Sequence, residues 1–135
     1  MLEAEVKSRH SEPLSPAILR SKVWVEQGGE VLLSEWRIAL LTEVAANGSL
    51  AAAAERLGVP YRTAWQRVKE MEARLGAPLL TTSSGGSEGG GSHLTPLAND
   101  LVGRFNRVTG GVADELATRF QREFGDLLDG GDASG

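Results

Sequence analysis

The sequence predicts a mainly helical fold with small β elements, on three observations. An alanine-rich segment, a tight turn and an amphipathic segment follow one another between Gly48 and Leu75. A glycine-rich stretch comes next, at 83–92, between two short apolar runs. A regular apolar stripe then extends from Leu97 to Leu127. Helix, turn, helix and glycine-rich loop in this order predict a winged helix-turn-helix, followed by a long C-terminal helix.

The composition sets the domain organisation that we expect. The chain has 135 residues, 41% of them hydrophobic, enough for one modest core. It contains no cysteine, no apolar run near the ~20 residues of a membrane span, and no secretory signal pattern. We therefore expect a cytoplasmic protein without membrane contact. Its predicted parts are a flexible N-terminus (1–13), the winged helix-turn-helix with an N-terminal hairpin (14–95), a C-terminal dimerisation helix (96–128) and a disordered tail (129–135).

The formal net charge of −4 is unevenly distributed along the chain. Residues 113–135 hold six acidic residues and two arginines, so they carry the whole excess. Residues 50–75 hold five basic and three acidic residues, a balance of +2. Because nucleic-acid binding requires a basic face and not a basic protein, the acidic total does not exclude DNA as a partner.

The N-terminal part predicts a β-hairpin and a first helix. Residues 22–27 alternate apolar with polar side chains, as a half-buried strand does, and Gly28-Gly29 suits a two-residue turn into 30–33. Ser34 is an N-cap for a helix that closes at Gly48. The apolar positions of this helix recur at spacings of three and four residues: Trp36, Ala39, Leu40, Leu41 and Val44.

Ser49 opens the central motif as the N-cap of a short helix of small residues, which another helix can approach closely. Gly58 ends this helix, and Val59-Pro60 forms the turn because proline disfavours helical geometry in the residue before it. Residues 61–75 form the second helix. We assign its apolar stripe, Trp65 included, to packing: Tyr61, Ala64, Trp65, Val68, Met71 and Leu75.

The other face of the second helix is the candidate DNA-binding surface. Arginine suits guanine edges, glutamine suits adenine edges, and threonine offers a hydroxyl or a methyl group. A recognition helix enters the groove with its N-terminus first, so the base-contacting candidates are Arg62, Thr63, Gln66 and Arg67. Lys69 and Arg74 suit phosphate, and Ser49 completes the candidate set. In an isolated helix these side chains would indicate only solvation, but the order of the neighbouring elements favours DNA binding.

The predicted wing runs from Pro78 to Thr95 around the glycine-rich tip. Glycine backbone can follow a phosphate chain closely, while a disordered connector is the alternative interpretation. No Gly-Lys-Ser/Thr closes the glycine run, so a nucleotide-binding P-loop is not favoured.

Thr95-Pro96 predicts the start of the long C-terminal helix, with a bend or break at Gly110-Gly111. Its stripe has more turns than a small core can cover, so we expect a homodimer through this helix, with Trp24 and the hairpin contributing. The alternative is that the stripe folds back onto its own domain. The candidate dimerisation residues are Leu101, Phe105, Val108, Val112, Leu116 and Phe120.

These motifs resemble the N-terminal DNA-binding domain of the ModE family. The members of this family are bacterial molybdate-responsive transcription regulators. The resemblance covers roughly residues 31–108. It rests on Gly48-Ser49-Leu50, on the Tyr-x-x-Ala-Trp start of the second helix and on the double glycines of the wing. LysR-type regulators share the helix-turn-helix pattern and the Leu-Thr-Pro that follows the wing.

The resemblance implies a sequence-specific transcriptional regulator that binds a palindromic operator in double-stranded DNA as a homodimer, and that acts on molybdenum-related genes. Arg62, Thr63, Gln66 and Arg67 carry over by position as the DNA-contacting face. In ModE itself, separate C-terminal domains bind molybdate, and nothing here corresponds to them. We therefore expect a stand-alone DNA-binding protein that uses no cofactor and does not bind molybdate directly.

A second function class stays open. In this alternative, the chain is an adaptor or anti-regulator that keeps the winged-helix fold but does not bind DNA, and its acidic tail repels or mimics DNA. An enzyme is not expected. His10 and His93 are far apart in the sequence and no nucleophile with its base is visible, so neither a catalytic nor a metal site is predicted.

Overall fold

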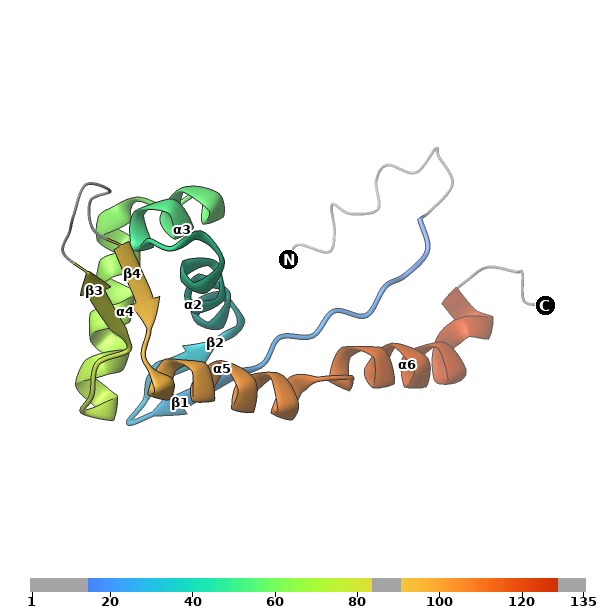
Figure 1. Ribbon diagram of the computed structural model, residues 1–135. Helices are drawn as coiled ribbons and strands as arrows, with labels where there is room; N and C mark the ends of the chain where they lie inside the picture. Colours follow the sequence, from blue (N-terminus) through green and yellow to red (C-terminus); the bar gives the residue numbers. More distant parts are fainter. Residues whose placement is uncertain (1–14, 84–90, 129–135) are drawn as a thin grey trace. The chain divides into compact units, whose positions relative to one another are not determined.

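The computed structural model describes residues 15–83 and 91–128. A β-hairpin, three helices, a second pair of strands and two further helices follow along the chain (Figure 1). The strands are β1 (Trp24–Gln27), β2 (Glu30–Ser34), β3 (Leu80–Ser83) and β4 (Gly91–Leu94). The helices are α2 (Glu35–Asn47), α3 (Leu50–Leu57), α4 (Tyr61–Leu75), α5 (Pro96–Thr109) and α6 (Val112–Leu128). This order confirms the predicted winged helix-turn-helix.

The helix boundaries follow the local signals of the sequence. Ser34, Ser49 and Thr95 each cap a helix by accepting a hydrogen bond from the backbone N–H three residues further on. Gly48 ends α2 in the left-handed conformation, at φ 79°, where a side chain would be strained. Pro60 then leads into α4, whose bounds are the predicted ones.

Both pairs of strands are antiparallel. β1 and β2 join at Gly28-Gly29, with an irregularity between Val25 and Glu26. In the wing, Leu80 pairs with Leu94 and Ser83 with Gly91. The wing strands attach to the turn between α2 and α3, because the Ser92 N–H donates to the Gly48 carbonyl at 2.8 Å. A Cβ on Gly91 would lie 2.8 Å from that same oxygen, so only glycine fits there.

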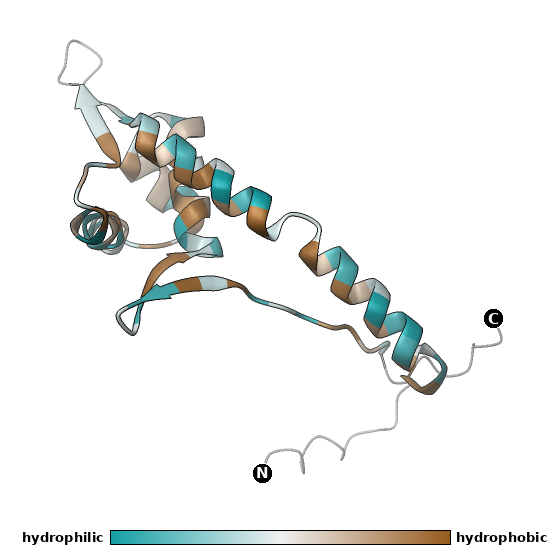
Figure 2. Cartoon of the chain, turned by 90° about the horizontal axis from the view of Figure 1, so that it is seen from below, coloured by the Kyte–Doolittle hydropathy of each residue, from teal (hydrophilic) through white to brown (hydrophobic). Residues whose placement is uncertain are grey.

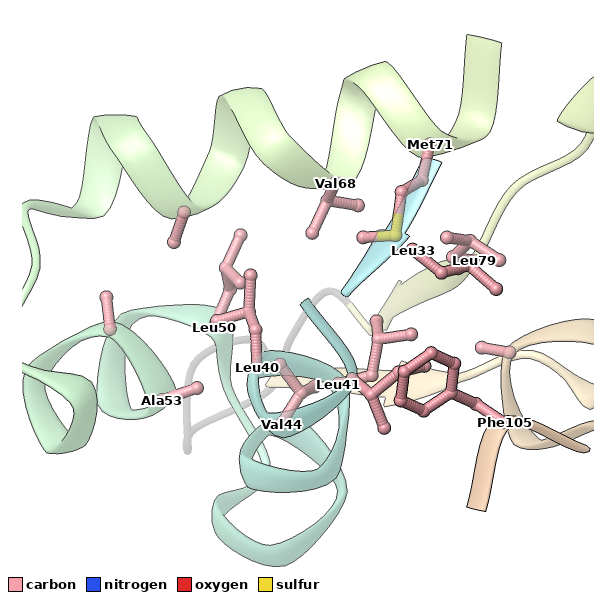
Figure 3. Close-up of a cluster of buried hydrophobic side chains, with 14 residues drawn as sticks. Leu33, Leu40, Leu41, Val44, Leu50, Ala53, Val68, Met71, Leu79 and Phe105 are labelled. Carbon is pink, nitrogen blue, oxygen red and sulfur yellow. The ribbon is translucent and has the colours of Figure 1, made fainter. Parts of the chain in front are cut away.

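The core lies between α2 and α4, closed by α3, α5 and the ends of the hairpin and wing (Figure 3). Leu40, Leu41 and Val44 of α2 are fully buried, facing Met71 of α4. Ala53, also fully buried, has a small side chain that lets α3 approach α2 closely. Apolar burial from four helices around one centre fixes how α3 and α4 are presented.

The chain divides into two compact units at Gly110 and Gly111. Residues 22–110 form the unit with the helix-turn-helix, and α6 belongs to the other. The predicted break at Gly110-Gly111 is confirmed. Within the described residues, no helix is long and apolar enough to cross a membrane. The predicted flexible N-terminus (1–13), wing tip and tail (129–135) lie outside the described residues.

Candidate nucleic-acid interface

The first two turns of α4 present two long polar side chains to solvent. Arg62 and Gln66, one helical turn apart, are both exposed. Among residues 15–83 and 91–128, neither forms a hydrogen bond or an ion pair within the chain. Their donors and acceptors are therefore available to a partner.

Arg67 lies on a different side of α4. It is half-buried, and its Nη1 is 3.0 Å from Glu70 Oε2, while the other oxygen of Glu70 accepts from Arg37 Nη2 at 2.9 Å. Arg67 also lines a surface cavity of about 570 Å³ between the hairpin and α2, together with Trp36 and Arg37. Thr63, one turn before it, is half-buried as well. Thr63 and Arg67 thus flank the exposed face instead of forming its centre.

The two predicted phosphate contacts both have partners within the chain. Lys69 Nζ is 3.1 Å from Glu72 Oε1 and 5.5 Å from the centre of the Trp65 ring. Arg74 donates to the Gln27 carbonyl at 2.6 Å and pairs with Glu30 at 3.3 Å. Arg74 therefore ties the end of α4 to the tip of the β1–β2 hairpin. Lys69 remains exposed beside Trp65.

Ser49 lies where α3 meets the wing. Its Oγ accepts from the Ala52 N–H at 2.9 Å, so the hydroxyl already serves as the helix cap. A hollow of about 210 Å³ opens beside it, between the start of α3, Tyr61 and the two wing strands. Ser49, Thr82 and Ser92 are among the residues that line this hollow. The start of α3 and the wing strands thus form one continuous surface with the start of α4.

Tyr61 and Trp65 are exposed, which corrects the assignment of both side chains to the core. Tyr61 is 53% and Trp65 is 45% exposed, whereas Ala64, Val68 and Met71 of the same stripe are buried. At 3.6 residues per turn, Trp65 projects about 90° from the mean direction of those three residues. With Arg62 and Gln66, the two aromatic side chains line a hollow of about 320 Å³.

The predicted dimerisation residues divide between α5 and α6. Phe105 is only 6% exposed and packs in the core of its own unit (Figure 3), against which Leu101 also packs. Val108 is 71% exposed. Leu116 and Phe120 are half-buried and Val112 is exposed, and no residue of α6 is buried. Hydrophobic residues recur along α6 between hydrophilic ones (Figure 2). The covered part of the stripe is on α5, and its uncovered part begins near Val108.

The pairing of Arg37 with Glu70 was not foreseen from the sequence. Arg37 is 9% exposed and lies on the inner side of α2, one turn before Leu41. Its Nη1 has no hydrogen-bond partner among the described residues. A charged residue at an apolar position of a helix is the signal that could have identified it, because such a residue requires a partner of opposite charge.

Comparison with known proteins shows which proteins this region is similar to. Residues 37–99 match the model of the bacterial regulatory helix-turn-helix proteins of the lysR family. The chain is similar to the molybdenum-pterin-binding protein MopB of Rhodobacter capsulatus, with 39% identity over 82 residues, which are 61% of this chain and 30% of that protein. It is also similar to the transcriptional regulator ModE of Yersinia pestis, with 33% identity over 93 residues, which are 69% of this chain and 32% of that protein.

A solved structure shares the same architecture. The crystal structure of the CbnR_DBD–DNA complex superposes with a TM-score of 0.51 and 26% identity, over 62% of this chain and 94% of that chain. The match with the curated relatives covers about a third of their length. Residues 37–99 of this chain are therefore similar to the helix-turn-helix domain of the lysR-family regulators, and the same region is similar in sequence to the ModE and Mop proteins.

Proposed function

We propose that this chain binds double-stranded DNA in a sequence-specific manner, with α4 in the major groove, and regulates transcription. The observation that carries the proposal is the exposed pair Arg62 and Gln66, which has no partner among the described residues and lies on the second helix of a LysR-type domain. Arginine and glutamine are the side chains that form two hydrogen bonds with guanine and with adenine. The solved relative with this architecture is a complex with DNA.

The charge distribution supports the same proposal. The first nine residues of α4, from Tyr61 to Lys69, include Arg62, Arg67 and Lys69 and no acidic residue. The positive end of the helix dipole lies at the same end of α4. A polyanion therefore meets a favourable field at the start of α4, although the whole chain carries a net charge of −4.

The target genes are proposed from the relatives. ModE proteins from several bacteria, and the molybdenum-pterin-binding proteins MopA and MopB, are similar to this chain. We propose that the genes it controls are related to molybdenum. No molybdate site is part of this proposal, because the similarity lies in the helix-turn-helix region.

We further propose that the chain acts as a homodimer through α6. No residue of α6 is buried, and Phe124 and Leu127 are 44% and 70% exposed. Phe120 and Phe124 stack at 5.2 Å between ring centres, so they form one apolar surface. A dimer places two α4 helices on a palindromic operator, with half-sites about 34 Å apart or a multiple of this distance.

A specific observation favours the alternative of a non-DNA-binding adaptor. Three of the cations of α4 that were expected to contact DNA already pair with acidic groups: Arg67 with Glu70, Lys69 with Glu72, and Arg74 with Glu30. These pairs are at least partly exposed, so each contributes about 1 kcal/mol or less and can yield to a phosphate. The roles of Arg62 and Gln66 therefore distinguish the two functions. A DNA-binding regulator contacts bases with these side chains, whereas the adaptor does not.

The test selects duplexes bound by the wild-type chain from a random-sequence pool and measures their affinity for variants. Arg62→Ala should weaken binding to the selected duplex about tenfold or more, because one bidentate base contact is lost. Arg104→Ala is the matched control, since Arg104 is an exposed arginine on α5 that pairs with Asp100. Selection of no sequence by the wild type, or equal affinities of Arg62→Ala, Gln66→Ala and wild type, would contradict the proposal and favour the adaptor.

The dimer has a separate test. Leu116→Asp should convert a dimer into a monomer, measured by light scattering at micromolar concentration, because it places a charge on the apolar surface of α6. Thr118→Asp introduces the same charge at an exposed position on another side of the helix and should leave the dimer intact. A monomeric wild type at this concentration would remove the dimer from the proposal.

A further inference from the structure

Two large aromatic side chains lie exposed side by side at the start of the recognition helix. Tyr61 and Trp65 are one helical turn apart, and about half of the surface of each remains exposed, 53% and 45%. The interior of the fold does not use them, because Ala64, Val68 and Met71 provide the buried face of α4. An exposed aromatic pair of this kind is typical of a contact surface.

The surroundings of the pair favour DNA over a protein partner. The hollow of about 320 Å³ is lined by Tyr61, Trp65, Arg62 and Gln66, so its apolar walls and its hydrogen-bonding groups face the same space. Lys69 Nζ lies 5.5 Å from the Trp65 ring centre, which adds a positive charge at the edge of the hollow. An apolar surface enclosed by cations, without an acidic residue from Tyr61 to Lys69, is complementary to a polyanion that carries apolar groups.

We propose that Tyr61 and Trp65 contact the 5-methyl groups of thymines in the major groove, and so select thymine beside the bases that Arg62 and Gln66 contact. This inference depends on the proposed DNA binding. The methyl group is the apolar feature that the major-groove edge of DNA presents, and it distinguishes thymine from cytosine. One helical turn separates the two rings by about 6 Å along the helix, which corresponds to roughly two base steps of 3.4 Å.

The test replaces thymine by uracil, which removes the methyl group and leaves the pairing edge unchanged. In the duplex selected by the wild type, each thymine within two steps of the positions sensitive to Arg62→Ala or Gln66→Ala is replaced singly. We expect at least one replacement to weaken wild-type binding about three- to fivefold, the value of one buried methyl group. Trp65→Gln should bind the thymine and uracil duplexes equally, and Tyr61→Ala should reduce the difference at a neighbouring position.

Ile18→Gln is the control, because Ile18 is an exposed apolar side chain, at 66%, that lies outside α4 and outside the predicted dimer contact. It should keep the full difference between thymine and uracil. If the wild type selects no sequence, DNA recognition itself fails. If the wild type selects a sequence but no uracil replacement weakens binding, or Trp65→Gln keeps the wild-type difference, the aromatic contact is wrong while DNA recognition stands. Circular dichroism verifies that each variant is folded, and Tyr61→Ala provides a second test should Trp65→Gln not fold.

Discussion

The two halves of α4 have opposite relations to the rest of the chain. In the first half, Arg62 and Gln66 have no partner among the described residues, and Tyr61 and Trp65 are exposed. In the second half, Met71 is fully buried and Arg74 contacts the hairpin. One helix thus leaves long side chains at its start without partners among the described residues and attaches its end to the rest of the fold. Its overall amphipathic pattern does not reveal this division, since both halves carry cations.

The largest expected difference between the halves is in stability. Met71→Ala should lower the free energy of unfolding by about 3 kcal/mol, because it opens a cavity in a fully buried position. Trp65→Ala removes a larger side chain but should cost less, about 1–2 kcal/mol, since Trp65 is 45% exposed and its removal opens no enclosed cavity. Urea unfolding of the two variants measures both values. Similar losses for both variants would show that Trp65 packs in the core after all.

Removal of the ion pair between Arg37 and Glu70, in the second half of α4, should have a smaller effect on stability. Glu70→Ala should lower the free energy of unfolding by about 2 kcal/mol, because it leaves the nearly buried Arg37 without its carboxylate. Adding Arg37→Met to this variant should restore part of the loss, since the unpaired charge is then removed as well. Glu72→Ala is less informative as a control, because the Glu72 carboxylate also accepts from the Leu79 N–H. Glu115→Ala, which loses only an exposed pair with Arg119, is better matched, and should change stability by less than about 0.5 kcal/mol.

A substitution that disturbs the attachment of the wing should lower the free energy of unfolding by a similar amount. Gly91→Ala should destabilise the chain by about 1–2 kcal/mol, because the added Cβ would approach the Gly48 carbonyl oxygen to 2.8 Å. Gly29→Ser is a useful contrast, since a Cβ there meets no atom within 4 Å and only the positive φ of 83° opposes it. Thermal unfolding compares the two. A neutral Gly91→Ala would mean that the wing strands can move away from the turn between α2 and α3.

The smallest expected effect concerns DNA affinity at the end of α4. Arg74→Ala should reduce affinity for the selected duplex less than about threefold, because the guanidinium already donates to the Gln27 carbonyl and pairs with Glu30. Gln66→Ala, in the first half, should reduce it about fivefold or more and relax the preference at one base position. Equal losses in a fluorescence-anisotropy titration would show that both halves of α4 contribute equally to DNA affinity.

Local signals were sufficient for the elements themselves. Ser34, Ser49 and Thr95 act on the N–H groups of their own helices, and Gly48 favours the left-handed conformation because it has no side chain. The spacing of apolar residues also identified part of the core, including Leu40, Leu41 and Val44 of α2. These predictions depend on interactions between neighbours in the sequence, which a single sequence displays.

Tertiary packing determines the features that the sequence did not predict. The stripe of α4 is wider than the surface that α2 and α3 can cover, and which edge stays exposed depends on how the helices pack, so Trp65 was misassigned. Glu70 pairs with Arg37, which is 33 residues away, and this contact orients Arg67 toward the flank. Phe105 belongs to a stripe that is continuous in the sequence, yet its ring is covered by the core of its own unit. None of these three outcomes follows from interactions between residues that are close in the sequence.

The attachment of the wing has a consequence for protein engineering. The two strands are held at their base by the pairing of Leu80 with Leu94, by the Ser92 N–H bond to Gly48, and by the Thr95 N–H bond to Leu79 at 2.9 Å. Thr95 also caps α5 and donates its hydroxyl to the Pro78 carbonyl, so this one residue joins the base of the wing to the helix that follows it. A redesign of the wing strands on this scaffold therefore has to keep Thr95.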